Sequence, residues 1–181
     1  MAARMRGRRP ALILAATLAL AACGGRSEPT RVPVSPASPP AAATPGPAAA
    51  EARASLERAL GERRLLLQDP QVSYRPAESP VVAQVPRTVY QAVLPDDPGH
   101  GYIVVYEFPD EPSASSGADA QAAYVASPVG RVQFPVGTDF IVRRLGRVVL
   151  FYAEPPHSPD DQAADVGQAL RTIGTEVTVP S

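Results

Sequence analysis

Two short segments of the chain place a histidine beside a pair of aspartates. His100 lies in residues 96–101, DDPGHG, and His157 opens residues 157–161, HSPDD. Imidazole and carboxylate groups together build metal sites and acid–base pairs, so a hydrolase that uses His100 or His157 is one hypothesis. Each aspartate pair also has a structural interpretation. Asp-Asp-Pro-Gly is typical of a turn, and acidic residues after Ser-Pro suit the first turn of a helix.

The sequence carries none of the common nucleophile, phosphate-binding or dinucleotide-binding motifs. Gly-x-Ser-x-Gly, phosphate-loop and Gly-x-Gly-x-x-Gly patterns are absent, and Ser-x-x-Lys is impossible because the chain contains no lysine. We therefore predict no catalytic, cofactor-binding or metal-ligating residue, and no bound cofactor. Arg143, Arg144 and Arg147 cluster at a predicted hairpin tip, where they either bind an anionic group or form a solvated turn.

The single cysteine, Cys23, follows the only long apolar run of the chain. Four arginines and no acid lie within residues 1–10, and residues 11–22, ALILAATLALAA, are all apolar or small. A basic segment, a short apolar segment and small residues at its end form a secretory signal. Its apolar helix would rise only about 18 Å against a hydrocarbon core of about 30 Å, so the run is too short to span a membrane.

Leu20-Ala21-Ala22-Cys23 resembles the lipobox of bacterial lipoproteins, in which a large aliphatic residue and two small residues precede an obligatory cysteine. The resemblance implies that the type II signal peptidase cuts before Cys23. It also implies that the thiol of Cys23 carries diacylglycerol and that its amine is often acylated as well. The alternative is an ordinary signal peptide cut elsewhere, which leaves Cys23 as an unpaired thiol because the chain has no second cysteine.

Lipid attachment at Cys23 predicts where the protein lies. Two or three acyl chains anchor a protein stably, at about 0.8 kcal/mol for each buried CH₂. We expect Cys23 to hold the chain on the outer leaflet of the cytoplasmic membrane or on the outer membrane, facing away from the cytoplasm. An aspartate directly after the lipidated cysteine resembles an inner-membrane retention mark. This chain has Gly24 at that position, which is compatible with sorting to the outer membrane.

Composition argues against a nucleic-acid partner. All 17 basic residues are arginine, and removal of residues 1–22 leaves 13 arginines against 18 acidic residues. A nucleic-acid-binding domain normally has a basic surface or a high isoelectric point. We therefore expect no nucleic-acid partner. The expected partners are the membrane, through the lipid on Cys23, and a protein of the cell envelope.

Composition also divides the chain into three parts. Residues 1–22 are the predicted signal peptide, residues 23–50 carry Cys23 and a Pro/Ala-rich linker, and residues 51–181 have the length of a single α+β domain. Seven prolines and seven alanines in residues 26–50 cannot build a core, so we expect a disordered linker there. In extended polyproline II geometry it reaches about 75 Å, either as a spacer from the membrane or as a tail without a selected length.

Periodicity and turn residues predict the elements of the domain. Helices are expected at residues 51–70, 116–128 and 158–174, the last with Ser158 as its N-cap. Strands are expected at residues 85–95, 102–108 and 175–179, with a hairpin over 138–155 that turns at Leu145-Gly146.

From residue 102 the order β-α-β-β-α-β resembles that of ferredoxin-like domains, a likeness of topology without a motif behind it. We expect an α+β fold whose antiparallel sheet of about five strands has helices packed on one face, preceded by a helix and an extra strand. A conflict remains, because strand 85–95 and the last strand compete for the same edge of strand 102–108. Either the earlier strand displaces the last one, or it joins the sheet elsewhere.

These observations leave three functional hypotheses. The first is a non-catalytic binding module of the cell envelope, held by an anchor and a spacer. The second is the hydrolase that uses His100 or His157. The third is a carrier of a small apolar ligand, with a pocket between helices and sheet.

Overall fold

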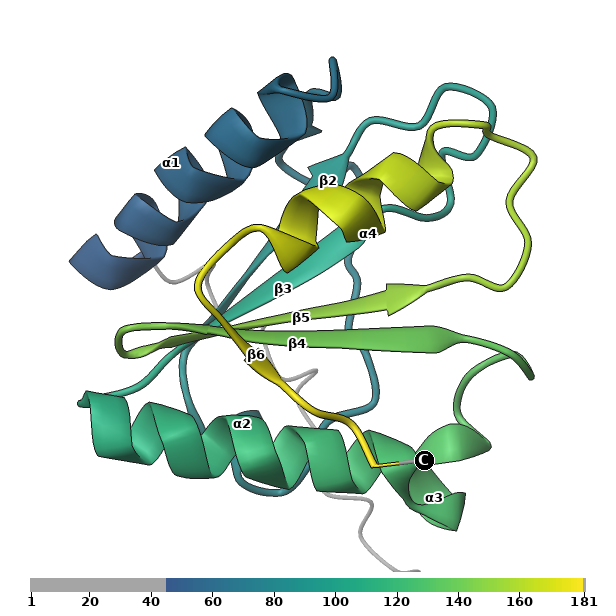
Figure 1. The fold of residues 1–181 in the computed structure, drawn as a ribbon. Coiled ribbons are helices and arrows are strands. Elements are labelled where there is room, and N and C mark those ends of the chain that lie inside the picture. Colours follow the sequence, from purple (N-terminus) through teal and green to yellow (C-terminus); the bar gives the residue numbers. More distant parts are fainter. Residues whose placement is uncertain (1–44, 181) are drawn as a thin grey trace, which may run out of the picture. The chain divides into compact units, whose positions relative to one another are not determined.

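The computed structural model describes residues 45–180 and confirms an α+β fold (Figure 1). The elements in chain order are α1 (Pro47–Gly61), β1 (Leu67–Gln68), the 3-10 helix η1 (Val82–Gln84), β2 (Arg87–Ala92), β3 (Tyr102–Glu107), α2 (Glu111–Ala126), α3 (Pro128–Arg131), β4 (Asp139–Leu145), β5 (Val148–Glu154), α4 (Ala163–Arg171) and β6 (Thr175–Val177). The predicted signal peptide, Cys23 and the linker up to residue 44 lie outside the described residues. Within the described part, no helix is both long and apolar enough to cross a membrane.

The strands form one antiparallel sheet in the order β1-β2-β3-β5-β4-β6. β5 lies between β3 and β4, as expected for a strand with two apolar faces. β2, the predicted extra strand, pairs with β3, so the earlier strand does displace the last one. β6 pairs instead with the outer edge of β4, and the strand order therefore differs from the ferredoxin-like arrangement.

Helices cover both faces of the sheet, which corrects the expectation of one covered face (Figure 1). α1 and α4 pack on one face, against alternate strand residues such as Ile103, Val105 and Leu150. α2 packs on the other face, against the residues between them, such as Val104 and Phe151. Because successive side chains of a strand point to opposite faces, the buried runs of β3 and β5 serve two separate cores.

The displaced last strand explains why the helices lie on both faces. α2 connects β3 to β4 and α4 connects β5 to β6, and each connection skips one strand in the same direction across the sheet. β3 and β5 run antiparallel to each other. Two crossovers of the same hand that advance in the same direction from oppositely directed strands must place their helices on opposite faces.

α1 is shifted relative to the predicted helix over residues 51–70. It begins at Pro47, within the expected linker, and ends at Gly61, so Leu67 belongs to β1. Leu65 N–H donates to the carbonyl of Leu60, and Arg64 has a φ of 63°, which together form a Schellman motif. The motif lets Leu65 pack beside Leu60 in the core and turns the chain toward the sheet.

The other two long helices also begin at different residues from those predicted. The N-cap of α2 is Asp110, whose side chain accepts a hydrogen bond from Ser113 N–H at 2.7 Å, so the helix starts five residues before Ser116. α4 starts only at Ala163, and Ser158 is not its N-cap. The hairpin turn falls on residues 146–147, with Gly146 at a φ of 57°.

Candidate functional site

The structure brings the two histidine-bearing loops together. Asp97 accepts hydrogen bonds from His100 Nδ1 at 2.5 Å and from Ser158 Oγ at 2.5 Å. The backbone N–H of Asp96 donates to Asp160 Oδ2 at 3.0 Å. Asp97 and Asp160 are both buried. Two buried carboxylates therefore fasten the turn before β3 to the loop before α4.

The Asp97 carboxyl group is held in its ionised form. Burial acts to raise its pKa, but the hydrogen bonds from His100 and Ser158, together with the charge that His100 can carry, outweigh burial and lower the pKa of Asp97. An ionised carboxylate only accepts hydrogen bonds, so Nδ1 of His100 carries a proton and Nε2 of the neutral ring is free to act as a base. A carboxylate-oriented imidazole of this kind is suited to general acid–base chemistry.

The second predicted histidine does not join this pair. The His157 side chain is exposed and has no hydrogen-bond partner within the described part of the chain. The Ser158 hydroxyl donates to Asp97 and is thus not held as a nucleophile against His100. Among residues 45–180, no three His, Asp or Glu side chains are grouped so that they could hold a metal ion. The structure therefore holds one His–Asp pair, His100 with Asp97, within the first predicted cluster, and the second cluster adds the hydrogen bond from Ser158 to Asp97.

A cleft of about 210 Å³ opens beside His100 at the end of the sheet. Its aromatic and proline lining is formed by Tyr74, Tyr102, Phe134, Pro135 and Pro155. Tyr74 and Tyr102 stack with ring centroids 4.3 Å apart and ring planes 8° apart. Burial, with Tyr102 nearby, raises the pKa of Tyr74, so its hydroxyl stays neutral and can donate a hydrogen bond. We call this site the aromatic cleft.

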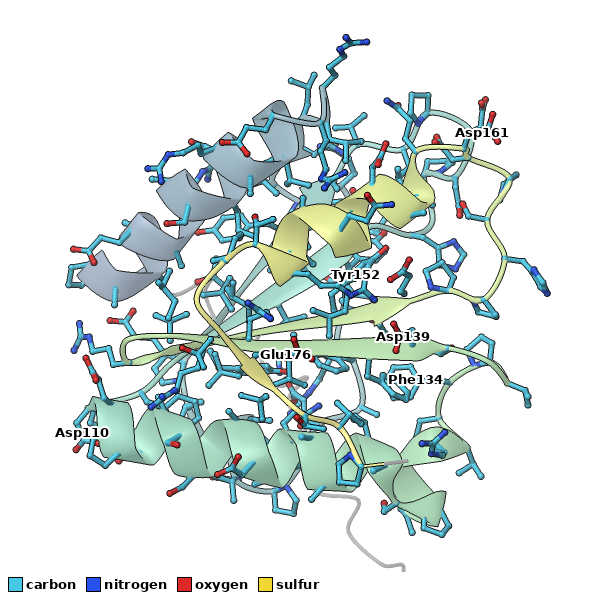
Figure 2. The ribbon with its side chains drawn as sticks, in the orientation of Figure 1. Asp110, Phe134, Asp139, Tyr152, Asp161 and Glu176 are labelled. Carbon is cyan, nitrogen blue, oxygen red and sulfur yellow. The ribbon has the colours of Figure 1, made fainter. Side chains whose placement is uncertain are left out.

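The antiparallel sheet positions the aromatic cleft. β3 begins at Tyr102, β5 ends near Ala153 and β4 begins just after Thr138, and these three strand ends lie at the same end of the sheet. Phe134 lies at this end, close to Asp139, in Figure 2. Its ring packs edge-on against Phe140, with centroids 4.9 Å apart, so one side of the cleft is anchored to the core under α2.

An exposed apolar surface continues the aromatic cleft. Val132 and Val136 are 77% and 99% exposed and line a second hollow that shares Phe134 and Pro135 with the cleft. We call these two valines the apolar rim. Val129, which lies nearby on α3, is also exposed, by 65%. The loop after α2 thus leaves apolar side chains in water beside an aromatic hollow.

The arginines at the hairpin tip have structural partners. Arg143 is buried, and its guanidinium donates to the carbonyls of Ile173 at 2.7 Å and Gly174 at 2.9 Å, beyond the end of α4. Arg147 donates to Glu107 at 2.8 Å. Within this cluster at most one guanidinium, that of Arg144, is therefore left to bind an anion. One guanidinium does not form a cationic patch.

Sequence reasoning missed the aromatic cleft. Tyr74 and Phe134 lie in segments for which no element is predicted, and both reach the cleft only through the sheet order. The one available indication is the stretch RVQFPVG, residues 131–137, which carries large apolar residues in a Pro/Gly loop without helix or strand periodicity. The cleft also lies at the end of the sheet, and not between helices and sheet as the carrier hypothesis expects.

Comparisons with protein-family models, with curated proteins and with solved structures found no match to this chain. The class that the fold defines is an α+β domain in which an antiparallel sheet lies between helices on both faces.

Proposed function

We propose that the chain is a lipid-anchored, extracytoplasmic protein whose domain is a non-catalytic binding module of the cell envelope. The observation that carries this proposal is the apolar rim beside the aromatic cleft. Contiguous exposed apolar surface of this kind is uncommon on monomeric proteins and marks interaction sites. The lipobox-like residues before Cys23 support the anchor.

Magnitudes indicate how a partner binds. Burial of one valine side chain contributes about 1.5–3 kcal/mol. Association costs about 4–15 kcal/mol in lost translational and rotational freedom. The two valines of the apolar rim are therefore insufficient alone, and a partner must also place a side chain in the aromatic cleft. Aromatic and proline walls favour an apolar or aromatic group there.

Photo-crosslinking in cells tests the binding surface. A photoreactive residue replaces Val136, and a matched chain carries it in place of Val81, which is 47% exposed elsewhere on the domain. We expect a reproducible adduct from the Val136 position that Val132→Ser removes, and none from the Val81 position. Equal adducts from both positions, or none from either, would count against a binding role of this surface.

The anchor has its own test. Cys23→Ser removes the only sulfhydryl that could be acylated. We expect the variant to leave the membrane fraction or to remain unprocessed, because no acyl chain then holds it. A mature Cys23→Ser chain that still sediments with membranes would refute the lipid anchor.

The His100–Asp97 pair favours a hydrolase as the second candidate. In that reaction Nε2 of His100 takes a proton from water as the water oxygen adds to a carbonyl carbon. The imidazolium then returns the proton to the leaving group, so the ring ends as it began. The aromatic cleft beside the ring would hold the apolar part of the substrate.

Matched histidine variants test the second candidate with p-nitrophenyl acetate as the probe. If the domain is a hydrolase, His100→Ala abolishes turnover while His157→Ala, which removes an exposed ring without hydrogen-bond partners in the described part, leaves it unchanged. Equal rates for wild type, both variants and buffer would exclude ester hydrolysis at His100.

A further inference from the structure

We propose that the aromatic cleft takes an aromatic side chain from an extended segment of a partner protein, and that the same segment places a carboxylate against Arg131. The inference rests on the proposed function, because it assumes that this surface binds a partner, and it adds the chemistry of that partner. It is carried by the floor of the aromatic cleft, by the walls of the cleft and by the charges around it.

The floor of the aromatic cleft belongs to one row of side chains that crosses the sheet. The strand registers place five residues opposite one another in neighbouring strands, on the face of the sheet that α2 covers. In the order of the sheet these residues are Gln68, Gln91, Tyr102, Ala153 and Phe140. Neighbouring strands lie about 4.8 Å apart, so the row is about 19 Å long. An extended chain rises about 3.3 Å per residue, so about six residues of a partner would follow the row.

Three hollows open along this row and share their walls. One hollow, of about 350 Å³, is lined by Gln68 and Gln91 and shares Tyr102 with the aromatic cleft. On the other side of the cleft, the hollow at the apolar rim shares Phe134 with the cleft and has Phe140 in its lining. The three hollows therefore form one groove across the end of the sheet, with the aromatic cleft at its middle.

The walls of the aromatic cleft form a slot over Ala153. On one side Tyr74 stacks on Tyr102, and on the other side Phe134 packs edge-on against Phe140. Between these two aromatic pairs the row contributes only the methyl group of Ala153. Tyr102 and Phe140 are two strand spacings apart, about 10 Å, and paired rings have their centroids about 4.5–7 Å apart. The slot therefore has room for one further aromatic ring between the two pairs.

The charges around the groove favour a carboxylate on the partner. Among the described residues that line the three hollows there is one arginine, Arg131, one histidine, His100, and no acidic residue. After residue 22 the chain has 13 arginines against 18 acidic residues, so a groove without acid differs from the rest of the protein. Arg131 is exposed, and its guanidinium donates only to backbone carbonyls within residues 45–180, those of Ala126 at 3.2 Å and Pro180 at 3.4 Å. Its charge is thus available to a carboxylate of the partner.

The geometry also limits the spacing of the two anchors on the partner. Arg131 lines the hollow beyond Ala153, at the Phe140 end of the row. That hollow is at least one strand spacing from the slot, about 5 Å, which corresponds to about two residues of extended chain. The carboxylate is therefore expected at least two residues from the aromatic residue of the partner.

Fluorine NMR of the full 181-residue chain in detergent tests the slot. All six tyrosines lie at or after residue 74, and 3-fluorotyrosine therefore places probes in the domain, two of them at the slot. The ligands are the synthetic peptides acetyl-Phe-Gly-Gly-Glu-amide and acetyl-Glu-Gly-Gly-Phe-amide, which present a ring and a carboxylate in the two chain directions. Matched peptides carry alanine in place of phenylalanine, or glutamine in place of glutamate.

We expect at least one phenylalanine peptide to move the resonances of Tyr74 and Tyr102, assigned with Tyr→Phe variants, in a saturable manner. The alanine peptides should leave them in place, a comparison that depends on no variant of the slot. Ala153→Leu, which fills the slot, should weaken binding at least tenfold, because the ring is then no longer buried. Ala123→Leu adds the same side chain at an exposed position of α2 and should leave binding unchanged.

A cycle of two changes tests the ion pair. Arg131→Gln should weaken binding of the glutamate peptide about two- to fivefold, the range of exposed ion pairs. The same variant should leave binding of the glutamine peptide unchanged, because that peptide has no charge to lose. An equal effect of Arg131→Gln on both peptides would overturn the assignment of a carboxylate to Arg131.

Two further results would overturn the inference. The first is a set of phenylalanine peptides that leaves the resonances of Tyr74 and Tyr102 unmoved. The second is equal movement with the alanine peptides.

The photo-crosslinking experiment in cells separates this inference from the proposed function. We expect Ala153→Leu to remove the adduct that the photoreactive residue at position 136 forms. An adduct that persists in Ala153→Leu overturns the inference and leaves the proposed function standing. Failure of the chain with Ala153 intact to give any adduct counts against the proposed function itself.

Discussion

Asp97→Asn is the perturbation with the most direct structural consequence. Asp97 is the buried carboxylate that accepts from His100 and Ser158 and so joins two loops 61 residues apart in the chain. Asparagine keeps the size of the side chain but has one acceptor oxygen in place of two and an amide that cannot accept.

The expected loss follows from the two hydrogen bonds. A hydrogen bond to a charged group contributes about 1.5–3 kcal/mol, and a neutral one about 0.5–1.5 kcal/mol. The introduced asparagine would accept one neutral bond at its oxygen, and its NH₂ group could bond the other partner only if the Ser158 hydroxyl or the His100 ring changed from donor to acceptor. We expect the free energy of unfolding to fall by about 2–4 kcal/mol at neutral pH.

The effect must depend on pH in a defined direction. The pKa of Asp97 is lowered in the folded chain, so its contribution is fully present above the ordinary aspartate value of about 3.9 and is lost as pH falls through the folded value. Urea unfolding, followed by far-UV circular dichroism, should show a large difference between wild type and Asp97→Asn at pH 6. The two curves should approach each other below about pH 4.

Asp161→Asn is the matched control, because Asp161 is exposed in the same pair of loops. We expect it to change the free energy of unfolding by less than about 0.5 kcal/mol. The reasoning is refuted if both variants lose the same stability, or if the loss in Asp97→Asn is the same at pH 3 and pH 6.

Three further predictions concern stability. Tyr152→Phe should stabilise the fold by about 1 kcal/mol, because the buried hydroxyl of Tyr152 lacks a partner within the described residues. Tyr106→Phe should destabilise the fold, because the hydroxyl of Tyr106 donates to the buried side chain of Glu78 at 3.1 Å, so the urea midpoints of the two variants should shift in opposite directions. Arg64→Gly should raise the free energy of unfolding by about 0.5–1 kcal/mol. Glycine relieves about 1–2 kcal/mol of left-handed backbone strain, which exceeds the cost of about 0.5–1 kcal/mol from the greater entropy of the unfolded chain. An unchanged melting temperature would contradict this prediction. Gln121→Leu should cost about 2–4 kcal/mol, because the buried amide pairs two backbone groups of the loop before η1, and a loss below about 1 kcal/mol would show that water replaces it.

Local patterns predict the individual elements of this domain better than their arrangement. The continuous run of β-branched and aromatic residues in β3 and the hairpin over β4 and β5 identify three strands, and the two apolar faces of β5 identify it as central. Helix ends are less predictable. Asp110 and Ser158 are both plausible caps by residue type, and only the packing of α2 and α4 decides that the first caps a helix and the second bonds Asp97.

The meeting of the two histidine loops has no counterpart in the sequence pattern. His100 and Ser158 lie 58 positions apart, and the pairing of β3 with β5 is what places their loops at one end of the sheet. The sequence pattern indicates the two segments that meet and the residue types that they carry. It could not choose between His100 and His157, because that choice depends on which ring reaches Asp97.

The departure from the ferredoxin-like order is also what builds the aromatic cleft. In that order the last strand would lie beside β3, and the chain before β2 would have no place at this edge of the sheet. Here β2 pairs with that side of β3, so the segment before β2 runs close by and Tyr74 stacks on Tyr102 at the start of β3. Glu78 fastens this segment through Arg87 at 2.9 Å and through Tyr106. The strand that looked like a topological conflict therefore brings its preceding segment, with Tyr74, to one wall of the proposed binding site.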